Sequence, residues 1–207
     1  MSPRLEPLSR GTLPGAPTVC HGCVWWQARG AKTVDKKRWI DLAEESWGPW
    51  GMLYIDDDKR PLGVMQYAPA FLFPRSQRLP AGPASEDAVL VTCAYLIDSA
   101  SPWVVQSLFL AAAGEARSRG AAALEAFAYR YSEADDFEQR LICHRAIFPA
   151  DLLADLGFVT IRSAGRVQLE RLELGGLEPC AEVEGPGLLS KLKRFYLPAP
   201  VPAPPRP

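Results

Sequence analysis

Hydrophobic and polar residues follow one another along the chain in blocks that predict both strands and helices. The run AVLVTCAYLI at 88–97 is almost entirely apolar, which is typical of a strand buried on both faces. Residues 102–118 are helical in periodicity, with Pro102 fitting the first helical position and Gly120 the position past the end. AALEAFAY at 122–129 predicts another strand. A strand, a helix and a strand at this spacing form a right-handed unit whose two strands are parallel.

Further elements flank this central unit. Predicted strands lie at 19–26, 51–55, 61–68, 158–163 and 166–174, and predicted helices at 33–47, 149–156 and 186–196. The proline-rich residues 69–87 predict a long loop. The pattern predicts an α/β fold, an α+β mixed sheet with a central β-α-β unit. We expect a lead-in at 1–18, one domain at 19–196 and a disordered proline-rich tail at 197–207.

The composition and net charge of the chain limit the kinds of molecule that we expect it to bind. With 207 residues and a net charge of −1, the chain suits one domain and carries no electrostatic footprint for nucleic acid. No apolar run reaches the ~20 residues of a membrane span, and the N-terminus has no apolar signal region. We therefore expect a cytoplasmic protein that binds neither nucleic acid nor membrane, as a monomer or a homodimer.

The motif CHGC, with Cys20 and Cys23, raises the question of a metal or redox site. A structural zinc site needs four ligands, and only Cys143 and His144 are available to complete one. A redox pair needs a helix N-terminus after its first cysteine, whereas the following residues predict a strand. Packed, reduced thiols and no metal are the interpretation we prefer.

Three strings together resemble a known family. CAYLID at 93–98, GEARSRGAAALEAFAY at 114–129 and ADLLADLGFVTI at 150–161 occur in the order seen in the GCN5-related N-acetyltransferase (GNAT) superfamily. The resemblance implies a GNAT-like acyl-CoA N-acyltransferase fold, in which acetyl-CoA lies between the two parallel strands and its pyrophosphate at the helix N-terminus. It also implies transfer of acetyl to a primary amine, which is either a small molecule or a protein lysine. Within the predicted long loop, the segment FLFPRSQRLP at 71–80 is either a plain connection or a lid over the acceptor site.

The resemblance assigns cofactor contacts to two segments. At the strand end these are Ala94, Tyr95 and Leu96, whose backbone amides would polarise the thioester carbonyl. At the helix start they are Trp103, Val104, Val105 and Gln106. The family's glycine positions are here Trp103 and Val105, and Pro102 removes one amide donor. Two alternatives stay open: a working enzyme with altered coenzyme contacts, or a catalytically degenerate fold that binds or regulates.

Catalytic candidates lie on the second parallel strand. Glu125 and Tyr129 share the face opposite the crossover helix, so Glu125 is the candidate general base and Tyr129 the candidate acid. The tyrosine that often acts as the acid in the family falls on Leu153, which has no proton to give. The alternatives are a salt-bridged strand residue for Glu125 and a packed aromatic for Tyr129.

Overall fold

The computed structural model describes residues 4–29, 34–97, 102–131 and 147–176. The chain divides into two compact units, Met1–Gly175 and Gly176–Pro207, and every described helix and strand belongs to the first. Within the described residues, no helix combines the length and the apolar character that crossing a membrane requires.

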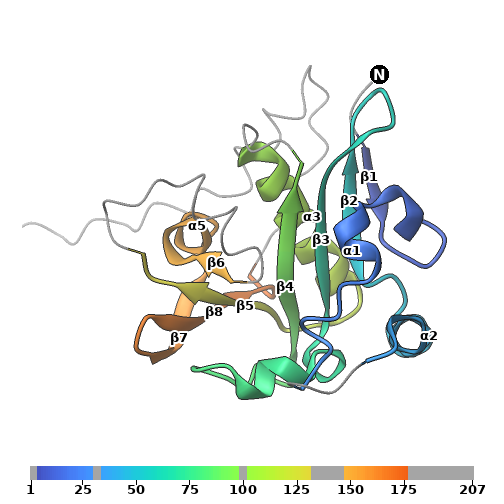
Figure 1. The fold of residues 1–207 in the computed structure, drawn as a ribbon. Helices are drawn as coiled ribbons and strands as arrows, with labels where there is room; N and C mark the ends of the chain where they lie inside the picture. The colour runs from blue at the N-terminus through green and yellow to red at the C-terminus, as the bar shows by residue number, and fades with distance from the viewer. Residues whose placement is uncertain (1–3, 30–33, 98–101, 132–146, 177–207) are drawn as a thin grey trace, which may run out of the picture. The chain divides into compact units, whose positions relative to one another are not determined.

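An eight-stranded mixed sheet runs through the described part of the first unit (Figure 1). Seven strands lie side by side in the order β1-β2-β3-β4-β5-β8-β7, and β6 pairs with β5. The pairs β4–β5 and β5–β6 are parallel, and the other neighbours are antiparallel. The strands are β1 (Arg4–Pro7), β2 (Gly51–Ile55), β3 (Pro61–Pro69), β4 (Ala88–Leu96), β5 (Ala123–Tyr129), β6 (Phe148–Pro149), β7 (Val159–Ala164) and β8 (Val167–Glu173).

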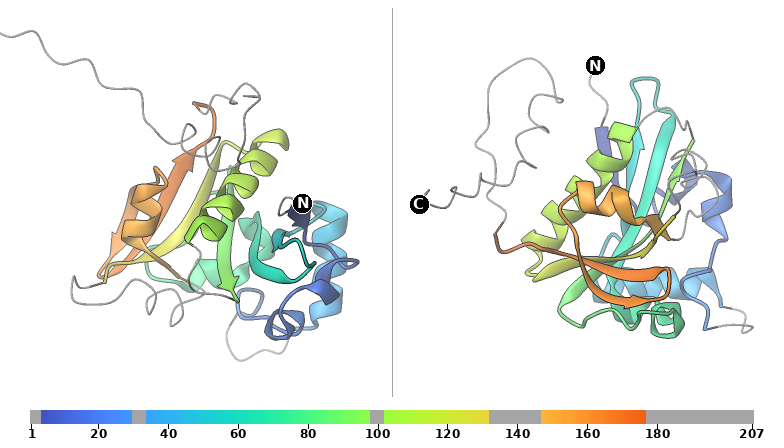
Figure 2. Two further views of the ribbon diagram at one scale, coloured as in Figure 1. Left: turned by 90° about the horizontal axis from the view of Figure 1, so that it is seen from above. Right: turned by 90° about the vertical axis from the view of Figure 1, so that its left-hand side faces the viewer.

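Helices cover both faces of this sheet (Figure 2). They are α1 (Thr18–His21), α2 (Lys36–Ser46), α3 (Pro102–Ser118) and α5 (Ala150–Asp155), with 3-10 helices η1 (Leu13–Gly15), η2 (Ala70–Leu72) and η3 (Pro74–Arg78). Phe109 of α3 packs against Phe148 and Phe158, so α3 and the segment around α5 share one face. On the other face, Trp39 of α2 packs against Trp50 and Phe73.

The predicted fold class is confirmed: the sheet is mixed and holds a β-α-β unit, β4-α3-β5, at its centre. The bounds of β2 and α3 agree with the prediction. The predicted helix at 33–47 is α2, which begins later because the Asp35 carboxylate accepts from the Lys37 amide at 2.9 Å and so caps it. The predicted helix at 186–196 and the tail at 197–207 lie outside the described residues.

The predicted strand at 19–26 is wrong. Its first residues form α1, and a turn follows in which the Ala28 amide donates to the Val24 carbonyl at 3.0 Å. The segment crosses a face of the sheet and buries Trp26 there, with its ring stacked on Phe127 of β5. The position beside β2 is taken by β1, from within the predicted lead-in. Of the apolar residues that suggested a strand, Trp26 is buried against the sheet, whereas Val19 and Trp25 are 56% and 37% exposed. A local apolar run does not distinguish this arrangement from a strand.

The two parallel strands part halfway along their length. β4 and β5 pair from Ala88–Ala123 to Val91–Ala126. At that point β4 contains a bulge at Thr92, since Tyr67 of β3 pairs with Val91 and Gln66 with Cys93. A bulge bends its strand and increases the local twist. β4 therefore continues beside β3 alone, and β5 turns away from it (Figure 1).

Candidate functional site

Beyond the bulge, β4 presents an open edge, residues 92–96, that no described strand pairs with on the β5 side. The Ile97 amide donates to the Leu62 carbonyl at 3.0 Å, toward β3. Backbone groups of an antiparallel strand alternate between its two sides, so Ala94 and Leu96 direct their N–H and C=O groups toward the β5 side. Tyr95 belongs to the ladder with β3. Of the three candidate amides, those of Ala94 and Leu96 therefore point toward the β5 side, where the two strands part, and that of Tyr95 points toward β3.

The N-terminus of α3 follows β4 in the chain. Pro102 begins the helix and has no N–H, so Trp103 and Val104 are the described first-turn residues whose amides lack an acceptor within the helix. These amides and the helix dipole favour an anion.

Most side chains of that first turn pack against the rest of the protein. Val104 and Val105 are 1% and 0% exposed, and Trp103 packs edge-on against Tyr54 with ring centroids 5.2 Å apart. Gln106 is exposed. A ligand at this turn would therefore meet backbone amides and the Gln106 side chain, because both valines face the core.

Glu125 lies in a buried ion pair. Its side chain is 0% exposed, its Oε1 is 3.0 Å from Nη1 of Arg171, and its Oε2 accepts from the Ser85 amide at 2.7 Å. Arg171 also bonds Asp87 and Glu173, and these carboxylates raise the pKa of the guanidinium above its usual range. Glu125 pairs with Leu90, on the side of the bulge where the strands are still joined. This environment favours a structural role for Glu125.

Tyr129 occupies the end of β5 that turns away from β4. It is half-buried, and its ring lies 4.9 Å from that of Tyr131. Leu153, at the position of the family tyrosine, is 0% exposed in α5. Among the two catalytic candidates, Tyr129 is the one located where the strands have parted.

A pocket of about 240 Å³ lies on the face of the sheet opposite α3. We call it the tryptophan pocket. Its lining includes the open edge of β4 through Cys93, Ala94 and Tyr95. The other lining residues are Leu8, Val19, Cys20, Cys23, Trp25, Trp26, Gln27, Lys36, Trp50, Val64 and Gln66. Since Trp26 stacks on Phe127 of β5, the pocket adjoins both of the diverging strands.

Lys36 brings the one charge among the described residues that line this pocket. Its Nζ donates to the Cys23 carbonyl at 2.9 Å and lies 4.6 Å and 5.0 Å from the ring centroids of Trp39 and Trp50. Burial lowers the pKa of this ammonium group. Burial likewise raises the pKa of the Cys93 thiol to about 12, which keeps it protonated near neutrality.

The cysteines of CHGC both line the pocket. Among the described residues no group of His, Cys, Asp or Glu is arranged to hold a metal ion. Cys143 and His144, which a zinc site would have required, lie outside the described residues.

Comparison with known proteins identifies the fold. No family model and no curated protein sequence matches the chain. Among solved structures, an N-acetyltransferase from Staphylococcus aureus Mu50 matches 84% of this chain and 99% of its own, with 13% identity and a TM-score of 0.52. YncA from Salmonella typhimurium, a proposed acetyltransferase solved with its cofactor acetyl-CoA, matches 91% and 99%, with 12% identity and a TM-score of 0.50. The chain has the GNAT fold.

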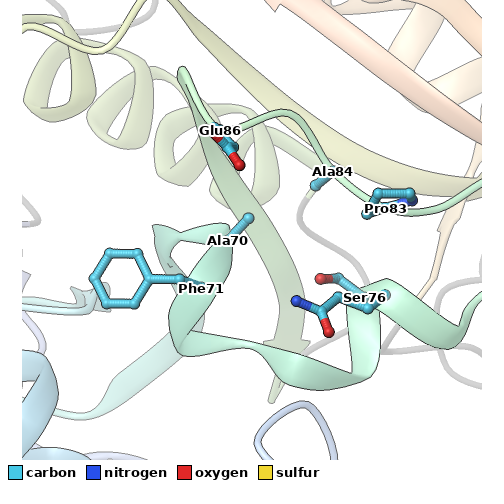
Figure 3. A pocket seen from close by; sticks show the side chains of 7 residues that line it. Ala70, Phe71, Ser76, Pro83, Ala84 and Glu86 are labelled. Carbon is cyan, nitrogen blue, oxygen red and sulfur yellow. The ribbon is translucent and has the colours of Figure 1, made fainter.

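A second pocket lies at the other end of β4 in this GNAT fold. It measures about 580 Å³ and is formed by η2, η3 and the stretch before β4 (Figure 3). Ser76, Ala84 and Glu86 are among its lining residues, and the 60% exposed Phe71 extends away from Pro83 and Ala84. We call it the loop pocket. It adjoins the start of β4, whereas the open edge is at the end of that strand.

The long loop supports the tryptophan pocket from behind. The Arg75 side chain donates to the Trp25 carbonyl, and its guanidinium lies 4.2 Å from the centroid of the Trp25 ring. The Arg75 amide donates to the Trp26 carbonyl at 3.2 Å. Both tryptophans are thereby held in place from outside the sheet.

Sequence reasoning missed Lys36, Gln27 and Gln66 as pocket residues. Gln27 and Gln66 are 4% and 8% exposed, and Gln27 Nε2 donates to Gln66 Oε1 at 3.3 Å. The available signal was a glutamine in the apolar run GVMQYA of β3. Whether Gln66 lines a pocket depends on which segment covers that face of β3. The covering segment, residues 19–26, was predicted to be a strand of the sheet.

Proposed function

We propose that this chain is an acetyl-CoA-dependent N-acetyltransferase that acts on a primary amine. The observation that carries the proposal is the open edge of β4, with the amide-bearing N-terminus of α3 following it in the chain and the tryptophan pocket beside it. The GNAT fold of the chain supports it, because the YncA structure of this fold holds acetyl-CoA.

The residues present fit that coenzyme. Ala94 and Leu96 offer N–H and C=O groups on an edge without a described strand partner, which suits the amide-bearing arm of coenzyme A. Trp103 and Val104 offer amides for the pyrophosphate, and Gln106 a side-chain donor. Acetyl-CoA supplies an acetyl group activated as a thioester. An amide of the open edge stabilises negative charge on the thioester oxygen, and Tyr129 is the proposed donor of a proton to the leaving sulfur.

The same proposal extends to the binding partners of the protein and to its location in the cell. We propose a cytoplasmic protein, monomeric or homodimeric, that acts on a small amine or a protein lysine and not on nucleic acids or membranes. The near-zero net charge of the chain supports this choice of partner.

One observation favours a second candidate, a binding or regulatory protein without turnover. The first turn of α3 carries no glycine, and its first residue, Pro102, has no N–H, so the turn offers fewer amides and a less open backbone than a glycine-rich turn.

Thermal unfolding with coenzyme, followed by an assay of thiol release, separates the candidates. Acetyl-CoA at about a hundred times its Kd stabilises by about 2.7 kcal/mol, a rise in Tm of about 5–10 °C for a domain of this size. We expect that rise with acetyl-CoA and desulfo-CoA but not with ATP, and free thiol once an amine is added. A rise without thiol release on any amine supports the binding protein. No rise at millimolar coenzyme contradicts the transferase and supports a protein that binds or regulates a partner without the coenzyme.

A further inference from the structure

The walls of the tryptophan pocket match a flat apolar group. Trp25 and Trp26 form one wall with ring centroids 4.9 Å apart in an edge-on arrangement, and Trp50 contributes a third indole. Leu8 and Val64 are further apolar lining residues. Aromatic rings prefer such edge-on and offset contacts, and a volume of about 240 Å³ limits the occupant to a small molecule.

The charge of the pocket disfavours a cation. No described lining residue is Asp, Glu or His, and the single charged side chain is the Lys36 ammonium. The aliphatic amine of a lysine has a pKa of about 10.4 and arrives as a cation that must lose a proton before it attacks. The described lining residues include no carboxylate and no histidine that would accept that proton near neutrality, and the Lys36 ammonium repels the incoming charge.

Neutral polar groups are present instead. Thr92 Oγ1 and Gln27 Nε2 both donate to Gln66 Oε1, at 3.2 Å and 3.3 Å. Gln66 Nε2 and Gln27 Oε1 take no part in these two hydrogen bonds. Two nearly buried amides thus offer one donor and one acceptor, which suits an uncharged NH₂ group with hydrogens to give.

We propose that the tryptophan pocket binds the acetyl acceptor and that this acceptor is a small aromatic amine, uncharged at neutral pH. The inference rests on the proposed transferase function and specifies its substrate class. An aromatic amine delocalises its lone pair into the ring, so it is unprotonated near neutrality and needs no base to deprotonate it before attack. Its ring contacts the indoles, and its nitrogen reaches the acetyl carbon held at the open edge of β4.

The reaction balances without another reagent. The amine nitrogen forms a bond to the acetyl carbon as the carbon–sulfur bond breaks. The nitrogen then loses one proton, and the departing thiolate of coenzyme A takes up one proton. The products are the N-aryl acetamide and free coenzyme A.

Two isomeric amines test the proposal. 4-Methylaniline and benzylamine have the same atoms, but benzylamine is a cation at pH 7.5. We expect 4-methylaniline to bind measurably by calorimetry and to have a kcat/KM at least about tenfold higher in thiol release. Trp25→Ala removes an indole that is 37% exposed and should lower that kcat/KM by about tenfold. Phe71→Ala, an exposed aromatic in the loop pocket, is the matched control and should leave it unchanged.

The variant Lys36→Met tests the effect of the Lys36 charge on substrate preference, which would not change if Lys36 had only a structural role. It keeps the apolar stem and removes the charge, so the preference for 4-methylaniline over benzylamine should narrow several-fold. A preference for benzylamine or a lysine peptide in the unaltered protein overturns the inference and leaves the transferase standing. Equal binding of both isomers, or of neither, also overturns it. Selective binding of 4-methylaniline without any thiol release supports the pocket assignment and contradicts the transferase.

Discussion

The carboxylate of Glu125 has the right chemistry for a base, and its surroundings determine what it does. It accepts from the Ser85 amide and pairs with Arg171 while its side chain is fully buried. A carboxylate in such a pair mainly stabilises the native state, because removal of one partner leaves the other charge buried and less well compensated. If Glu125 loses its charge, Arg171 still forms ion pairs with Asp87 and Glu173, so the positive charge of Arg171 stays partly compensated.

Glu125→Gln should therefore affect stability more than turnover. We expect the free energy of unfolding to fall by about 1–3 kcal/mol in denaturant titrations. We also expect kcat, measured where the variant is folded, to change by less than about threefold, whereas loss of a general base lowers it by about 10²–10⁴. Asp87→Asn, which alters a half-exposed partner of the same arginine, is the control and should cost within about 1 kcal/mol. A hundredfold loss of kcat in Glu125→Gln alone would restore Glu125 as the base.

Pocket residues were harder to predict than the strand residues. Ala94 and Leu96 were assigned from the resemblance to the GNAT superfamily, and the buried strand that carries them is visible in the sequence. Lys36 and Trp25 come from two segments that meet only when the chain folds over the sheet. The sequence around each of these two residues does not indicate that they share a pocket, because a tryptophan, or a lysine near the start of a helix, is common on protein surfaces.

At the scale of elements, α3 shows what periodicity determines. Its apolar positions and its terminal Pro102 and Gly120 predicted both bounds. The same pattern also explains the missing glycines, because Val104 and Val105 face the core, and Val104 Cγ1 lies 2.8 Å from where a Cβ on Gly63 would be. The first turn thus packs against β3 with side chains, where a glycine-rich turn would leave the backbone open.

Val105→Gly tests whether that side chain obstructs coenzyme binding. Because Val105 is fully buried, we expect a loss of about 2–4 kcal/mol in unfolding free energy from the cavity and the glycine backbone. The Kd for acetyl-CoA in calorimetry should change by less than about threefold, since the side chain faces away from the ligand. Gln106→Gly, at the next and exposed position, is the control and should cost about 1 kcal/mol. Tenfold tighter binding by Val105→Gly would show that the valine does block the backbone.

For the whole molecule, the order of elements from β2 to β8 was largely predictable, because each has its own hydrophobic pattern and turn residues. The edge strand β1 was not. Its residues, Arg4–Pro7, alternate weakly and end in proline, and only their pairing with β2 makes them a strand. Residues 19–26 instead begin within α1 and lie on a face of the sheet, where Trp26 stacks on Phe127. Strand membership at a sheet edge depends on which segment reaches the edge, and a local pattern does not contain that information.

Removal of residues 1–8 should consequently weaken the whole first unit. The deletion takes β1 from β2 and removes Leu8, which is 1% exposed and lines the tryptophan pocket. Loss of one such leucine alone costs about 2–5 kcal/mol, so we expect Tm to fall by about 10 °C in circular dichroism. Affinity for 4-methylaniline should fall as well, because the pocket loses part of its wall. Deletion of the proline-rich tail at 197–207, which we predict to be disordered, should leave both quantities unchanged. An unaltered Tm after the first deletion would mean that β1 contributes nothing to the stability of the sheet.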